Sequence, residues 1–151
     1  MAVKDWSNED CIYLAGVIDS RAIMYMKSRY NVVHNHLGYS INFNFFSGDK
    51  SVLRVLASLL GEEIRYYTDT RTTKSVMMTR IHVTDIKPIY EKCVPYMRSE
   101  YRKKLFLFLV RMRDTYPSDK RLYNKRNRIP IEVLKEREAI YNEYLEFVNE
   151  K

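Results

Sequence analysis

The chain has 151 residues, 46% of them hydrophobic, which suits one compact core and is too little for two ordinary domains, so we expect a single domain over residues 1–151. Its formal net charge of +7 favours a polyanionic partner such as nucleic acid. We find no long apolar run and no apolar leader, which argues against a membrane protein and favours a cytoplasmic one. No residues have metal-ligand spacing, so we expect no zinc site, and Cys11 and Cys93 are expected to be reduced thiols.

The first elements in chain order are a helix and a long hairpin. Ser7 or Asn8 can cap a helix that runs to about Ser20. Alternating polar and apolar residues then indicate strands with one polar face each. The predicted strand, loop and strand cover residues 22–31, 32–38 and 39–46.

A second helix and hairpin follow. Ser47-Gly48-Asp49 forms a turn and caps a helix that Gly61 ends, and residues 64–71 and 75–83 form two strands around a turn at residues 72–74. A helix capped by Thr84-Asp85 then runs through residue 97. Pro88 lies in its first turn, and Pro95 is expected to bend or end it.

Two further helices are predicted at the carboxyl end, over residues 99–113 and 131–148. The loop between them is basic, and its cations either contact phosphates or form a solvated surface. These cations are Lys120, Arg121, Lys125, Arg126 and Arg128. The predicted fold class is therefore α+β, in the order αββαββα with two extra carboxyl-terminal helices and an antiparallel sheet.

One segment of the first helix resembles the signature motif of the LAGLIDADG homing endonucleases. It reads Tyr13-Leu14-Ala15-Gly16-Val17-Ile18-Asp19-Ser20-Arg21-Ala22, and the seven leading positions of the motif fit. The elements up to about residue 113 resemble the same family in order and spacing, and the motif occurs once. The resemblance implies a homodimer in which two such helices pack closely. The residues it places at the dimer interface are Tyr13, Leu14, Ala15, Gly16 and Ile18.

The resemblance also implies that the catalytic site has changed. The eighth motif position, where the family has a metal-binding acid, is Arg21, and a guanidinium there repels a divalent ion. Glu100 and Ser47 stand where the family places a Lys and often a Gln. Asp19 is expected to serve helix termination and local hydrogen bonding, and Arg21 either meets DNA phosphates or pairs with Asp19 or Glu100. We therefore expect no metal, no cofactor and no enzyme activity.

The polar strand faces supply the residues expected to contact DNA, because Asn suits adenine edges and Arg or Lys suits guanine. Together with Arg21 they are Tyr25, Lys27, Arg29, Asn31, Ser40, Asn42, Asn44, Arg65, Tyr67, Arg71, Arg80 and His82. The apolar face is expected to bury Ile41, Phe43, Phe45, Ile81 and Val83 under helices.

These observations lead to one hypothesis and two alternatives. The hypothesis is a nuclease-dead homodimer that binds a pseudo-palindromic site in double-stranded DNA and acts as a transcriptional repressor of a phage or mobile element. The first alternative is an active or nicking endonuclease with an altered metal site. The second is an RNA-binding splicing cofactor.

Overall fold

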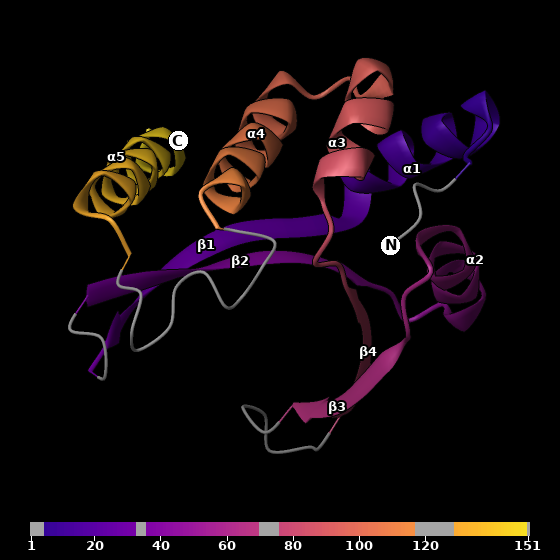
Figure 1. The fold of residues 1–151 in the computed structure, drawn as a ribbon. Coiled ribbons are helices and arrows are strands. Elements are labelled where there is room, and N and C mark those ends of the chain that lie inside the picture. The colour runs from indigo at the N-terminus through magenta and orange to yellow at the C-terminus, as the bar shows by residue number, and fades with distance from the viewer. Residues whose placement is uncertain (1–4, 33–35, 70–75, 117–128, 151) are drawn as a thin grey trace. The chain divides into compact units, whose positions relative to one another are not determined.

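A computed structural model of the protein describes residues 5–32, 36–69, 76–116 and 129–150, with the side chains of residues 31, 36, 67–69 and 76–78 left out (Figure 1). The elements confirm the predicted α+β class, with αββαββα followed by two helices. In order they are α1 (Asn8–Arg21), β1 (Ala22–Asn31), β2 (His36–Phe46), α2 (Lys50–Leu60), β3 (Arg65–Asp69), β4 (Val76–His82), α3 (Lys87–Cys93), the short 3₁₀ helix η1 (Val94–Tyr96), α4 (Glu100–Asp114) and α5 (Ile131–Asn149).

The four strands form one antiparallel sheet in the order β1-β2-β4-β3. Between β2 and β4, Asn44 lies opposite His82, and between β3 and β4, Arg65 lies opposite Arg80. Directly opposed residues project from the same face of a sheet, as do residues two apart on a strand. The register therefore places these four polar side chains on one face.

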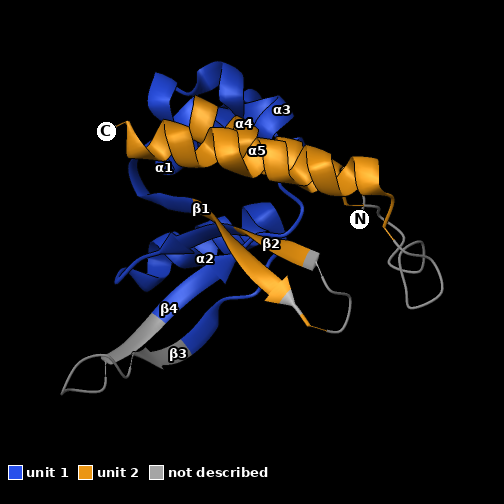
Figure 2. Ribbon diagram, turned by 90° about the vertical axis from the view of Figure 1, so that its left-hand side faces the viewer, with its two compact units in different colours: residues 1–24, 42–103 blue, residues 25–41, 104–151 orange. Residues whose placement is uncertain are grey.

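The chain divides into two compact units, residues 1–24 with 42–103 and residues 25–41 with 104–151 (Figure 2). We call them unit 1 and unit 2. Each has its own buried apolar cluster, and each is described separately below.

The core of unit 1 contains apolar side chains of α1, α2, α3, β2 and β4. Its buried side chains include Leu14, Ala15, Ile18, Phe43, Phe45, Leu53, Leu56, Ile81, Val83 and Ile89. The rings of Phe43 and Phe45 meet edge to face with centroids 5.4 Å apart. Ser7 begins α1 with a reciprocal capping box with Asp10, and Gly61 ends α2 at a φ of 66°, a left-handed conformation that glycine adopts without strain.

The core of unit 2 joins α4 and α5 to one face of β1 and β2. The Phe108 ring lies 5.5 Å from Phe147 and 6.2 Å from Tyr144, centroid to centroid. The Tyr144 hydroxyl accepts a hydrogen bond of 3.1 Å from the backbone N–H of Met26, and the Tyr39 ring lies 4.9 Å from Tyr141. Burial is the main cause that raises the pKa of Tyr39, so this hydroxyl stays protonated. The outward side of β1 and β2 in this unit is consequently the side away from α5.

Several expected boundaries differ from the structure. β2 begins at His36, three residues before the predicted start, and β3 begins at Arg65. The predicted cap at Thr84-Asp85 is wrong, because Ile86 precedes α3 and makes no side-chain capping bond. Pro88 in the first turn lacks the N–H that a capping side chain would bind. Pro95 does end the helix, which continues only as η1.

Two remaining expectations concern the turn and the membrane. The predicted turn over residues 72–74 lies outside the described residues. In the described parts of the chain, no helix has both the length and the apolar character needed to cross a bilayer.

Candidate nucleic-acid interface

The polar face of unit 1 combines two arginines with a histidine. Arg65 is exposed, and Arg80 and His82 are part-buried beside it. The His82 ring shares a hydrogen bond of 2.8 Å with Asn44, between Nδ1 and Oδ1. Burial lowers the pKa of His82, and the charges of Arg80 and Arg65 lower it further. This face therefore presents guanidinium donors next to a neutral imidazole.

Asn44, one of the residues expected to contact DNA, is buried. Its side chain is only 1% exposed, although alternation along β2 places it on the polar face. The cause is its position opposite His82, whose ring is hydrogen-bonded to the Asn44 amide oxygen. Asn42 on the same strand is part-buried. In this structure the Asn44 amide oxygen is therefore hydrogen-bonded to His82.

The outward face of unit 2 carries exposed cations on β1. Lys27 and Arg29 are exposed, as is Ser40 on β2, and the Lys27 ammonium lies 5.5 Å from the ring centroid of Tyr25. Tyr25 itself is part-buried. Because α5 packs against the Met26 side of β1, these side chains are left facing outward.

The other residues expected to bind DNA cannot be placed by their side chains. Asn31 and Tyr67 belong to β1 and β3, but their side chains are among those left out. The remaining six lie outside the described residues: Arg71, Lys120, Arg121, Lys125, Arg126 and Arg128.

Arg21, at the end of α1, contacts Ser47. Its Nη1 donates a hydrogen bond of 3.2 Å to the Ser47 hydroxyl, which also accepts from the backbone N–H of Asp49 at 3.0 Å. Glu100 instead forms an ion pair of 2.9 Å with Lys103, so the expected pairing of Arg21 with Glu100 is absent from the ion pairs of the described residues. Two of the changed positions of the motif comparison, Arg21 and Ser47, are thus direct neighbours.

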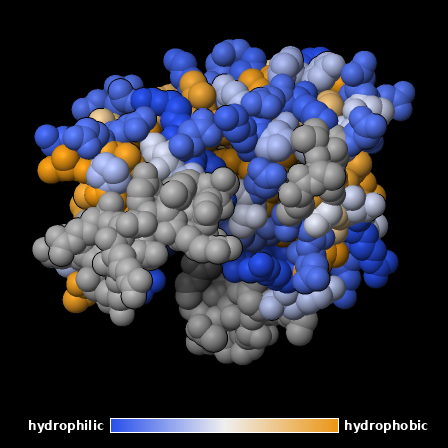
Figure 3. All heavy atoms as spheres, viewed as in Figure 1, coloured by the Kyte–Doolittle hydropathy of each residue, from blue (hydrophilic) through white to orange (hydrophobic). Residues whose placement is uncertain are grey.

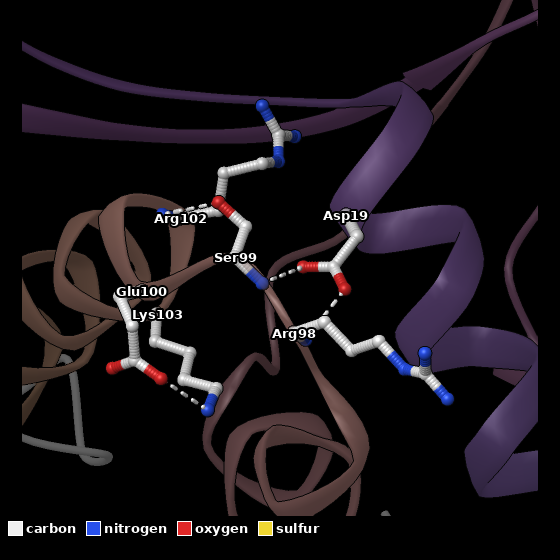
Figure 4. Close-up of polar contacts among 6 residues, drawn as sticks. All are labelled: Asp19, Arg98, Ser99, Glu100, Arg102 and Lys103. Atoms are coloured by element: carbon white, nitrogen blue, oxygen red, sulfur yellow. Dashed lines mark hydrogen bonds and ion pairs between the residues drawn. The ribbon is translucent and has the colours of Figure 1, made fainter.

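Asp19 makes long-range bonds where local ones were expected. Its carboxylate accepts from the backbone N–H groups of Arg98 at 2.8 Å and Ser99 at 3.4 Å, about eighty residues along the chain (Figure 4). Both donors directly precede α4, where backbone N–H groups lack partners within the helix. Asp19 therefore ties the end of α1 to the beginning of α4.

Arg102 of α4 also connects the end of α1 to the beginning of α4. Nothing in the sequence pattern pointed to this residue. Its Nε and Nη2 donate to the Ile18 carbonyl at 2.9 and 2.7 Å, and Nη2 also bonds the Ala22 carbonyl. These carbonyls flank Arg21 at the carboxyl end of α1, where acceptors lack helical partners. Burial lowers the pKa of Arg102, and Asp19 opposes that shift. Arg102 therefore fixes the backbone that carries Arg21.

The residues expected at a dimer interface divide between two sides of α1. Leu14, Ala15 and Ile18 are completely buried in the core of unit 1. The opposite side of the helix faces outward, which leaves Ile12 53% and Tyr13 40% exposed. Gly16 is also exposed, and a Cβ added there would meet no atom within 4 Å. Sequence reasoning missed Ile12, although helical spacing links it to Gly16.

The described surface in the view of Figure 3 is mostly hydrophilic, with smaller hydrophobic areas between the polar side chains. In the described residues, no cluster of three or more His, Cys, Asp and Glu could hold a metal ion within one chain.

Comparison with solved structures identifies the fold as that of the LAGLIDADG homing endonucleases. The chain is similar to the homing endonuclease I-CvuI in complex with an I-CreI target, at 14% identity and a TM-score of 0.65, over 91% of this chain and 80% of the other. It is similar to the archaeal intron-encoded homing endonuclease I-Vdi141I complexed with DNA, at 14% identity and a TM-score of 0.66, over 95% and 85%. A third neighbour is the group I intron-encoded I-CeuI complexed with DNA, at 14% identity and a TM-score of 0.54, over 89% and 68%.

No family model and no curated protein matches the sequence. The structural comparisons overturn the expectation that the protein is not an enzyme, because the solved structures with this fold are homing endonucleases.

Proposed function

We propose that this protein binds double-stranded DNA, with sequence dependence, through the polar faces of its strands. The observation that carries the proposal is the shared fold with homing endonucleases solved as DNA complexes. The outward cations Lys27 and Arg29 in unit 2, and Arg65 and Arg80 in unit 1, supply the donors that phosphates and guanine edges accept.

Binding to randomised duplexes at several salt concentrations tests this proposal. Each phosphate contact contributes about −0.9 to the log-log slope of affinity against salt. Replacing Lys27 or Arg29 with Ala should reduce the slope by about 1 if the side chain meets a phosphate, or relax one position of the consensus if it meets a base. Lys135→Ala is the matched control, since Lys135 is exposed on α5 and away from that face. A salt-independent affinity contradicts the proposal, and preference for folded RNA would favour the splicing role.

We also propose that two copies associate through the outward face of α1. The support is an exposed apolar pair, Ile12 and Tyr13, next to open space at Gly16, which would let a second helix approach closely. Such a dimer has two-fold symmetry, so its DNA site would be pseudo-palindromic. Sedimentation of the protein with and without DNA measures the association.

The second candidate function is cleavage or nicking of the bound DNA by an altered metal site. The observation in its favour is the class of the structural neighbours, which are homing endonucleases. Incubating the protein with bound plasmid and Mg²⁺ or Mn²⁺ should then give nicked or linear DNA. Glu100→Gln removes an exposed carboxylate near the end of α1 and tests whether this group contributes. Plasmid that stays supercoiled under all these conditions excludes the candidate.

A role as a transcriptional repressor in a phage or mobile element belongs to the same proposal, because a protein bound across a promoter blocks RNA polymerase by occupancy. A reporter placed behind the selected site measures this effect, and Lys27→Ala should weaken it in proportion to the lost affinity.

A further inference from the structure

Asn44 and His82 form a buried polar pair across β2 and β4. They are directly opposed in the strand register, and the Asn44 side chain is 1% exposed while the His82 ring keeps partial access to solvent. The bond of 2.8 Å joins the amide oxygen of Asn44 to Nδ1 of His82. An amide oxygen can only accept a hydrogen bond, so Nδ1 must carry the proton.

The surrounding charges decide the state of the second ring nitrogen. Burial, Arg80 and Arg65 all lower the pKa of His82, because each disfavours the imidazolium. A neutral imidazole with its proton on Nδ1 has a lone pair on Nε2, at the far edge of the ring from Asn44. His82 is then an acceptor beside two arginine side chains that can only donate.

We propose that Asn44 fixes His82 as the Nδ1–H tautomer, and that Nε2 of His82 accepts a hydrogen bond from a base amino group in the major groove, N4 of cytosine or N6 of adenine. Arg80 and Arg65 suit guanine N7 and O6, so the three side chains on this face read different base edges. His82 is then a specificity-determining residue and Asn44 a positioning residue. This inference rests on the proposed function, since it needs a bound duplex.

The tautomer is measured without DNA. Nitrogen-15 NMR of the imidazole side chains at neutral pH should show a protonated Nδ1 and an unprotonated Nε2 for His82. Asn44→Leu removes the acceptor and should shift the proton to Nε2. A wild-type ring protonated on Nε2, or on both nitrogens, overturns the proposal, whether or not the protein binds DNA.

Base reading is measured by selecting bound sequences with the wild type and with His82→Phe, which keeps a flat ring and loses the acceptor. The wild type should prefer cytosine or adenine at one position of each half-site. His82→Phe should lose about tenfold of that preference while the other positions keep theirs. Ser58→Ala, an exposed polar position on α2 outside the strand faces, is the control that should leave this position unchanged.

The outcomes separate the two claims. An unchanged consensus with His82→Phe overturns the reading role and leaves DNA binding intact. A wild type that selects no duplex at all overturns the proposed function and the reading role with it, even if NMR gives the expected tautomer. Should Asn44→Leu fail to fold, the wild-type spectrum and the His82→Phe selection decide the matter alone.

Discussion

Replacing Arg102 with Met should destabilise the protein by about 2–4 kcal/mol. The side chain bonds two backbone carbonyls, of Ile18 and Ala22, and a hydrogen bond from a charged donor contributes about 1.5–3 kcal/mol. Met keeps most of the packing of the aliphatic stem, so the loss is chiefly that of the bonds. For a chain of this size, the melting temperature should fall by roughly 5–15 °C.

Thermal and urea unfolding followed by circular dichroism measure this loss. Lys104→Met is the matched control, because it removes an exposed cation two positions along α4 and should change the stability by no more than about 0.5 kcal/mol. Arg102→Lys keeps the charge without the planar fork and should fall between the wild type and Arg102→Met. If Arg102→Met unfolds together with the Lys104→Met control, the two carbonyls do not depend on the guanidinium and the reasoning fails.

The partner in this junction is Asp19, which receives the N–H groups of Arg98 and Ser99. Asp19→Ala should cost about 1–2 kcal/mol, as the loss of a helix cap does. Because Asp19 and Arg102 hold the same two helix ends, the double variant should lose less than the sum of the single losses, with a coupling of at least about 0.5 kcal/mol. Additive losses would mean that the two contacts act independently.

Three further predictions concern single sites. The folded state lowers the pKa of His82 below its unfolded value of about 6.5, so the unfolded chain binds more protons. The free energy of unfolding should therefore decline as the pH falls from about 6.5 towards the folded pKa. Urea titrations at a series of pH values should show a smaller decline for His82→Phe. Gly16→Leu should keep the melting temperature, because the added side chain meets open space, but should shift sedimentation towards the monomer. Arg137 is 1% exposed, donates hydrogen bonds to Thr115 and lies 3.7 Å from the ring centroid of Tyr116. Arg137→Ala should therefore lower the free energy of unfolding, measured in urea, by about 3 kcal/mol. Arg137→Lys should restore only part of that loss.

Local patterns were sufficient for most of the fold. Alternation over residues 22–31 predicted both the strand and its apolar side, on which Met24 and Met26 are buried. The polar turn at residues 47–49 and Gly61 marked the ends of α2, because a capping side chain and a left-handed glycine each satisfy a need local to a helix terminus. Ile41 was expected in the core and is only part-buried, since alternation gives the face and not the depth.

The site was less predictable, because its contacts join residues far apart in the sequence. Arg102 reaches the end of α1 across about eighty residues, and no spacing within α4 distinguishes it from its exposed neighbour Lys104. Asn44 shows the same limit, because its burial depends on the histidine opposite it on β4. The alternation of side chains along a strand identifies the face of a residue, whereas register and packing decide whether a ligand can reach that residue.

The signature helix shows how one motif serves two purposes that the sequence does not separate. Leu14, Ala15 and Ile18 recur at the spacing of an inward stripe and fill the core of unit 1, while Gly16, between them, faces outward. Considered alone, the charge of the Arg21 guanidinium would repel a divalent ion at the end of this helix. In the structure Arg21 bonds Ser47, and Asp19 is committed to the start of α4. Any metal bound near this end of α1 would therefore need carboxylates other than Asp19, or a rearrangement that frees it, and the Asp19→Ala variant in the plasmid assay distinguishes these two cases.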